Sequence, residues 1–391
     1  MKQAPIIAAL QEVLSAIGEA VRTDDVQLAL VLHEPAKGHP SVARLLAALR
    51  AEPSLSIFDG PMQVVANQAS RVEIGNLAGW LLRRGLEVGS TQAIGDLQRY
   101  LEASDIPFSM ILGLTGLKVA GRCDLGGGIA LLPWDQLPDS HQKHTIYTRF
   151  LESFSFKWPS AAIVQEVVLP RLHVSDRESQ QHMRQLDESE LRDAILCIGA
   201  VGPFAPEVLI SWLAPPPWAP VMAGGFSLPH PEGGSRHDVW SEEHCRIAVR
   251  LFHHFRALNA EMKDALRLPL QRLSMAMRRL SKVDSAVDLG IALESLFLGD
   301  LPDDRGELTF RLRLRVARYM GQDRDRRANL FQLVGNLYTL RSIAVHTGRV
   351  PPHLKGSDTA DVLQDGFKLT ADAIRRFVLE GLPDWTAVQL Q

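Results

Sequence analysis

The chain has 391 residues, with 42 Lys and Arg against 45 Asp and Glu and a formal net charge of −3. This length is sufficient for two or three domains, each with its own hydrophobic core. The apolar fraction of 46% and the charged fraction of 22% are those of ordinary globular proteins, which excludes a wholly disordered, collagen-like or coiled-coil chain. A net charge near zero, taken alone, argues against a nucleic-acid-binding protein.

The first 235 residues mix helix and strand signals. Helices are predicted where apolar residues recur at helical spacing, over residues 6–17, 41–49, 71–87 and 91–103. Strands are predicted where aliphatic residues form short runs, over residues 26–32, 129–132, 163–169 and 220–228. The run Gly126-Gly127-Gly128 is typical of a tight turn between strands. We therefore predict an α+β domain over residues 1–235, with a role in sensing or recruitment.

A connector rich in Pro and Gly, residues 214–235, precedes a second half without strand signals. Helical periodicity covers residues 241–258, 262–281, 284–298, 307–320, 325–346 and 368–380. We expect four glycines to lie at or near the ends of these segments, namely Gly290, Gly306, Gly321 and Gly348. The sequence thus predicts an all-helical domain over residues 240–383.

The three cysteines, Cys123, Cys197 and Cys245, lie far apart and form no CxxC pair. This spacing argues against a disulfide framework and against a cysteine-rich zinc site, so we expect reduced thiols. No stretch reaches the ~20 apolar residues that a membrane-spanning helix needs, and the N-terminal segment is amphipathic rather than a signal-peptide core. We therefore expect a cytoplasmic protein with no membrane partner.

The charge differs between the two halves of the chain. Between Cys245 and Val350 there are 19 Lys and Arg against 11 Asp and Glu, so the rest of the chain carries an excess of acid. Because phosphate contacts dominate the affinity of proteins for nucleic acids, a basic helical half is compatible with RNA as a partner. The near-zero net charge is then no objection to RNA binding.

The helix predicted over residues 325–346 ends with Arg341 and His346, followed by Gly348. A histidine can take or give a proton near neutral pH, and an arginine can hold a phosphate and its developing negative charge. RNA supplies its own nucleophile, the 2′-hydroxyl. Such a pair can therefore cleave RNA without a metal or a cofactor, and we predict neither.

The spacing of Arg341 and His346 is not informative by itself. The chain contains three pairs in which four to six residues separate an Arg from a following His, which is the number expected by chance. Arg177 and His182 lie in a polar stretch typical of a loop, and Arg246 and His253 lie on a helix without a nearby turn signal. Five positions on an ideal helix correspond to a rotation of about 140°. Arg341 and His346 therefore converge if the helix loosens near His346, or if a second copy of the helix completes a composite site.

The segment Leu337-Tyr338-x-x-Arg341-Ser342-x-x-Val345-His346-x-Gly348 resembles the signature of the HEPN superfamily, specifically of its Apea-like branch. Residues 292–297 and 307–312 resemble the same branch in the same order. The resemblance covers residues ~240–380 and implies a helical bundle that forms a homodimer through the motif helix. It also implies metal-independent RNA cleavage, commonly in prokaryotic toxin or anti-phage systems.

On this resemblance, His346 is the expected general acid and base and Arg341 the phosphate clamp. Ser342 and Glu294 would support them, with Glu294 orienting Arg341 or His346 across the bundle; the alternative for Glu294 is a half-exposed helix position. Many active members carry Asn, Asp or His where Ser342 stands. The competing hypothesis is therefore a catalytically inactive dimer that binds RNA or a protein partner.

Three further residues are candidates for RNA binding. Arg311 and Arg315 could contact phosphates, and Tyr338 could stack on a base. The alternatives are a solvated helix face for the arginines and packing in a dimer interface for Tyr338. The expected partners are thus RNA and a second copy of the chain, together with an antitoxin or a phage-derived trigger.

Overall fold

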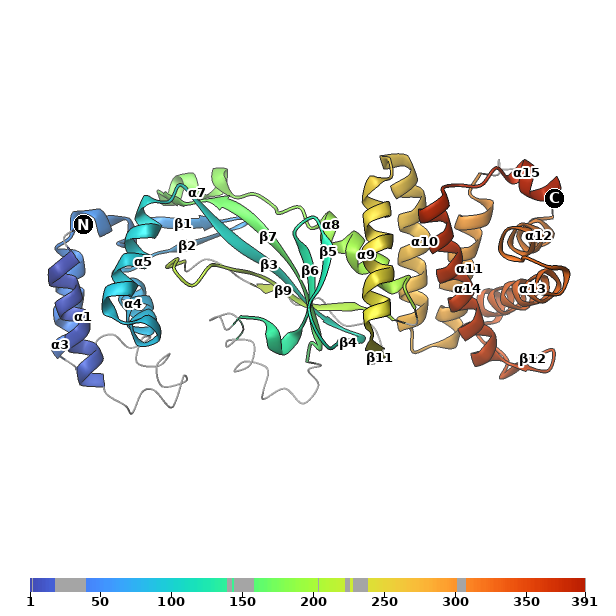
Figure 1. The fold of residues 1–391 in the computed structure, drawn as a ribbon, viewed down its shortest axis with the longest axis horizontal. Helices are drawn as coiled ribbons and strands as arrows, with labels where there is room; N and C mark the ends of the chain where they lie inside the picture. The colour runs from blue at the N-terminus through green and yellow to red at the C-terminus, as the bar shows by residue number, and fades with distance from the viewer. Residues whose placement is uncertain are drawn as a thin grey trace.

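The computed structural model describes the chain except for residues 2, 18–39, 139–142, 144–157, 203, 222–225, 228–237, 301–306 and 391. Figure 1 shows an elongated molecule with a helical N-terminal end, a twisted sheet in the middle and a second group of helices at the C-terminal end. The predicted α+β half is followed by a mostly helical half, as expected. The second half is not all-helical, because residues 353–358 contain a short antiparallel hairpin. Within the described ranges, every helix is too short or too polar to cross a membrane.

The N-terminal end combines helices with a small antiparallel sheet in the order β2-β1-β8. Its helices are α1 (Gln3–Ile17), α3 (Pro40–Arg50), η2 (Pro53–Phe58), α4 (Ile74–Val88) and α5 (Ser90–Glu102). Its strands are β1 (Met62–Val65), β2 (Gln68–Arg71) and β8 (Leu172–Val174). The four predicted helices are confirmed, although α4 starts later than expected because residues 68–71 form β2. The strand predicted over residues 26–32 lies outside the described residues.

The central sheet has six antiparallel strands in the order β10-β9-β3-β7-β6-β5. The strands are β3 (Asp105–Thr115), β5 (Cys123–Gly126), β6 (Ile129–Pro133), β7 (Ala161–Pro170), β9 (Glu207–Ala214) and β10 (Phe226–Ser227). The predicted turn is confirmed, since Gly126, Gly127 and Gly128 have φ of +92°, +65° and +77°, which glycine adopts without steric cost. Of the run predicted over residues 220–228, only Phe226 and Ser227 form a described strand.

The C-terminal end consists of packed helices (Figure 1). They are α9 (Glu242–Ala257), α10 (Ala260–Arg278), α11 (Lys282–Leu298), α12 (Leu308–Met320), α13 (Arg324–Thr347), α14 (Thr359–Glu380) and α15 (Trp385–Leu390). Small elements outside these groups are β4 (Leu117–Val119) paired with β11 (Asp238–Trp240), the hairpin β12 (His353–Leu354) and β13 (Ser357–Asp358), η3 (Trp134–Gln136) and α7 (Asp176–His182). The predicted helices are confirmed.

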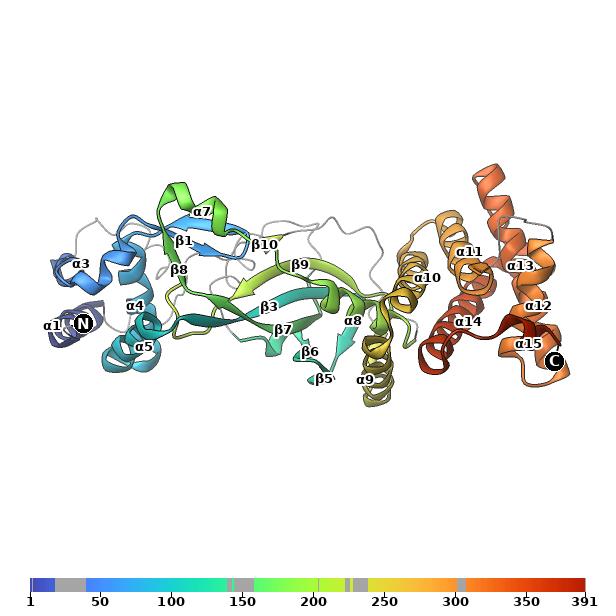
Figure 2. The same cartoon turned by 90° about the horizontal axis from the view of Figure 1, so that it is seen from above.

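Helix α8 (Ser189–Gly199), which the sequence did not predict, lies between the central sheet and the C-terminal helices (Figures 1 and 2). Its Asp193 accepts two hydrogen bonds from Arg267 of α10, at 3.0 and 2.8 Å. Arg375 of α14 donates to the carbonyls of Ala200 and Val201 just after α8, at 2.7 and 2.9 Å. A single hydrophobic core contains side chains of the sheet, of α8 and of helices α9 to α14, so packing continues across the predicted domain boundary.

The expectation of three reduced thiols is wrong for two of them. Cys123 of β5 and Cys245 of α9 form a disulfide, with their Cα atoms 6.0 Å apart. Their sequence separation of 122 positions concealed this pairing, because only the packing of α9 on β5 brings them together. Cys197 of α8 is buried and unpaired, and burial raises the pKa of its thiol.

Candidate functional site on helices 11, 12 and 13

Helix α13 carries the predicted Arg341 and His346 and remains regular through its last turn. Gly348 caps it in the left-handed conformation, with φ of +64°, and donates to the carbonyl of Ala344 at 2.9 Å. A glycine in this position is the usual end of a helix, because it has no Cβ to clash. The idea that the helix loosens near His346 is therefore wrong, and the two side chains leave α13 in different directions.

Arg341 is held by the neighbouring helix α11. Its Nη2 donates to Oε2 of Glu294 at 3.2 Å, and both side chains are partly buried. The Nε atom of Arg341 is buried and has no hydrogen-bond partner in the described part of the chain. Glu294 thus contacts Arg341 across the bundle from a helix position that is itself partly exposed.

Gly290 provides the space for this arginine. It lies in the middle of α11, one turn before Glu294, and not near a helix end as expected. A Cβ atom at this position would lie 2.6 Å from Cγ of Arg341, which is closer than real Cβ contacts. The absence of a side chain at Gly290 therefore lets the stem of Arg341 lie against α11.

His346 and Ser342 lie on the outer part of α13. His346 is exposed in the last turn, and Ser342 is half-buried one turn earlier. Among the described residues, no hydrogen bond or ion pair joins His346 to Arg341. Val345 beside His346 is 55% exposed, which is unusual for a large aliphatic side chain. A single chain therefore presents the two predicted catalytic residues separately.

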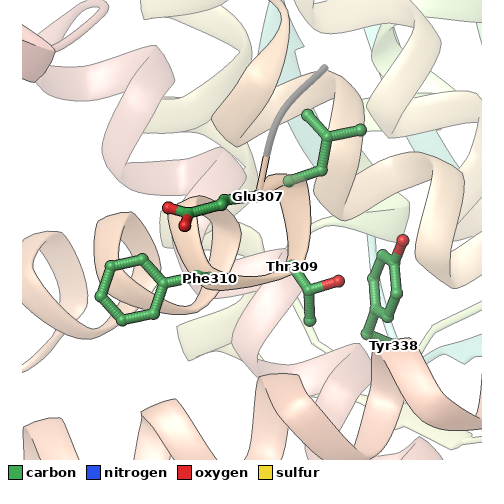
Figure 3. A pocket seen from close by; sticks show the side chains of 5 residues that line it. Glu307, Thr309, Phe310 and Tyr338 are labelled. Carbon is green, nitrogen blue, oxygen red and sulfur yellow. The ribbon is translucent and has the colours of Figure 1, made fainter.

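Tyr338 lies beside Arg341 and lines a shallow hollow. The guanidinium carbon of Arg341 is 6.0 Å from the centre of the Tyr338 ring. The hollow has a volume of about 590 Å³ and is formed by Tyr338, by Glu307 just before α12, and by the first residues of α12 (Figure 3), which are Leu308, Thr309 and Phe310. The structure thus brings Arg341 near both Glu294 and Tyr338, and Tyr338 lines the open hollow.

The two arginines predicted to bind RNA differ in their surroundings. Arg315 is only 4% exposed; it donates to the carbonyl of Phe297 at 2.7 Å and pairs with Asp300, and its guanidinium lies over the ring of Trp385. The prediction that Arg315 binds RNA is therefore wrong, because its hydrogen bonds and its burial leave the guanidinium inaccessible to a phosphate. Arg311 is partly exposed and has no ion pair with a described residue.

Phe310 and Gly290 were not among the functional residues predicted from the sequence. Phe310 is 51% exposed and contacts Phe331 of α13, with ring centroids 6.1 Å apart. The available signal was an aromatic residue immediately before Arg311 in a basic segment. The sequence signal for Gly290 was a glycine within an apolar helical run, because such a glycine lowers helix stability and often marks close packing.

No protein-family model, curated protein or solved structure matches this chain. In the described part of the chain, no group of three or more His, Cys, Asp or Glu side chains is arranged to hold a metal ion.

Proposed function

We propose that the chain is a metal-independent endoribonuclease of the HEPN type, which acts as a homodimer through α13. The observation that carries this proposal is the partly buried Arg341, held by Glu294 next to an open aromatic hollow, on the same helix that exposes His346. A cationic clamp beside a stacking surface, combined with an exposed imidazole from a second copy of the helix, is suited to a phosphodiester with an adjacent base. The cellular setting we propose is a prokaryotic toxin or anti-phage system.

The proposed reaction uses the 2′-hydroxyl of RNA as the nucleophile. His346 accepts the 2′-hydroxyl proton, the 2′-oxygen bonds to the adjacent phosphorus, and the bond from phosphorus to the 5′-oxygen breaks. Arg341 stabilises the additional negative charge on the phosphoryl oxygens. The protonated His346 then gives this proton to the leaving 5′-oxygen. The products are a 2′,3′-cyclic phosphate and a 5′-hydroxyl end.

The proposed dimer follows from the direction of the side chains on α13. Arg341 and His346 are about 140° apart around a regular helix, so one helix does not direct both at one phosphate. Two helices packed side by side would place His346 of one copy opposite Arg341 of the other. The exposed Val345 would be buried in such an interface, a favourable change for an aliphatic side chain.

The test is incubation of the purified protein with total RNA in EDTA. We expect cleavage by the unchanged protein, and a rate lower by about a hundredfold or more for His346→Ala and for Arg341→Ala. Arg246→Ala and His253→Ala are controls, because they remove another Arg/His pair that is exposed on a single helix, α9. Cleavage that survives both α13 substitutions would contradict this site assignment.

A mixing experiment tests the composite site. The inactive His346→Ala and Arg341→Ala proteins are mixed under conditions in which subunits exchange. A mixed dimer retains one intact arginine and one intact histidine on opposite copies, so we expect cleavage to reappear. If RNA binds but neither the unchanged protein nor the mixture cleaves it, the competing hypothesis of an inactive RNA-binding dimer replaces the nuclease.

A further inference from the structure

We propose that the hollow between Tyr338 and the start of α12 binds one unstacked nucleobase of RNA and prefers guanine. This inference rests on the proposed function, because it names the substrate feature that the same site would recognise. It concerns three residues at the start of α12 that have no role in the cleavage step: Glu307, Thr309 and Phe310.

The hollow has an aromatic residue on either side. Figure 3 shows Phe310 and Glu307 on one side and Tyr338 on the other, with Thr309 between them. Phe310 is 51% exposed, although a buried phenyl ring would typically contribute about 1.5–3 kcal/mol to stability. Its edge-to-face contact with Phe331 holds one end of the ring while half of it remains open to solvent. Exposed aromatic faces of this kind are the usual stacking surfaces for unpaired bases.

The charge around the hollow favours a nucleic acid over an apolar peptide. Residues 307–350, the segment that contains the lining of the hollow, have nine arginines and three acidic residues, although Arg315 among them is buried. Arg341 lies 6.0 Å from the ring of Tyr338, and Arg311 follows Phe310 directly in the chain without an ion pair to a described residue. A base in the hollow therefore has cationic side chains next to it for its own phosphates.

Glu307 is the acidic exception and suggests which base is preferred. An ionised carboxylate only accepts hydrogen bonds, and its two oxygens can accept from two neighbouring donors. Guanine is the base that presents two adjacent donors, N1–H and N2–H, on its Watson–Crick edge. The other three bases present at most one donor next to an acceptor there, which a carboxylate would repel. Glu307 at the edge of a stacking hollow therefore selects guanine.

The test measures binding separately from cleavage. Fluorescently labelled, uridine-rich hexanucleotides that differ in one central base (G, A, C or U) are titrated with the His346→Ala protein, and fluorescence anisotropy gives the Kd. We expect the tightest binding for G. Phe310→Ala should weaken binding of all four by about tenfold. Glu307→Gln should remove the preference for G, and Leu280→Ala, at an 81% exposed position outside the hollow, should change nothing.

The outcomes separate this inference from the proposed nuclease. Equal affinity for the four hexanucleotides overturns the guanine preference, and unchanged binding by Phe310→Ala overturns the base site, whether or not the protein cleaves RNA. Light scattering on each variant is the third readout. If Phe310→Ala converts a dimer into a monomer, the hollow is a protein interface and the base site is wrong. A preference for G without any cleavage supports the base site and contradicts only the nuclease.

Discussion

Arg341 of α13 donates to Glu294 of α11 at 3.2 Å, although 47 residues separate them in the sequence. The pair lies at the edge of the bundle, where both side chains keep some contact with solvent. An arginine in this arrangement is already oriented before a phosphate arrives, so less conformational entropy is lost on binding. The contact therefore makes Glu294 a positioning residue for the proposed reaction.

Replacing Glu294 should distinguish its effect on the position of Arg341 from its effect on the stability of the protein. For Glu294→Ala we expect a clear loss of RNA cleavage and a decrease of about 1 kcal/mol in the free energy of unfolding, because the pair is only partly buried. Cleavage rates and urea unfolding curves measure the two effects. Glu188→Ala, which removes a surface pair with Arg192, is the control and should change neither. Full cleavage activity in Glu294→Ala would show that Arg341 needs no orientation by α11.

Two glycine substitutions should have opposite effects on stability. Gly290→Ala places a Cβ 2.6 Å from the Arg341 side chain, so we expect destabilisation and a displaced Arg341. Gly95→Ala in the interior of α5 meets no atom within 4 Å and should stabilise the protein by up to about 1 kcal/mol. Thermal unfolding of both variants measures the difference. Equal melting temperatures would contradict the close packing at Gly290.

The disulfide between Cys123 and Cys245 should contribute to stability. It closes a loop of 122 residues, for which restriction of the unfolded chain is worth up to about 4–5 kcal/mol. We expect Cys123→Ser, or a reducing agent, to lower the urea midpoint of the purified oxidised protein. The urea midpoint of the Cys197→Ala protein should still fall when the reductant is added, since the Cys197 thiol is unpaired and the disulfide is still present. Identical midpoints with and without reductant would show that the bond does not form in solution.

Arg315 and Arg311 lie on the same helix and should respond differently to truncation. Arg315→Ala removes hydrogen bonds to the Phe297 carbonyl and to Asp300, so we expect a loss of about 2 kcal/mol in unfolding free energy. Arg311→Ala should change stability by no more than about 0.5 kcal/mol and instead weaken RNA binding, because it removes one cationic contact. Urea unfolding and RNA titrations at two salt concentrations test both expectations. Normal stability of Arg315→Ala would refute its structural role.

His173 should make the N-terminal end sensitive to acid. Burial lowers the pKa of His173 to about 4, with the nearby Arg171 charge acting in the same direction. Between about pH 6.5 and 4 the unfolded chain therefore binds a proton at this histidine more readily than the folded chain does. The free energy of unfolding is therefore highest above pH 6.5 and decreases as the pH falls through this range. We expect His173→Gln, which can still hydrogen-bond Tyr100, to reduce this loss. Urea midpoints near pH 7 and pH 5 compare the two proteins, and an equal decrease in both would contradict the shift.

The C-terminal helices were predictable from the sequence because their signals are local. Apolar residues at helical spacing, an N-cap at Ser241 and a terminal Gly348 each act within a few residues of the chain. The same signals placed Arg341 and His346 near the end of one helix. Helix α8 was not predicted, and its residues are buried on several sides between the sheet and the C-terminal helices.

The sequence alone determined where most helices lie, that the basic charge is concentrated in the second half, and that one helix carries Arg341 and His346. Tertiary packing decided that Glu294 meets Arg341, that Cys123 pairs with Cys245, and that Arg315 is buried while Phe310 is exposed. The physical reason is the range of the interactions. Helix formation depends on neighbours within about four residues, whereas these contacts join residues on different elements, whose approach depends on the packing of the whole core.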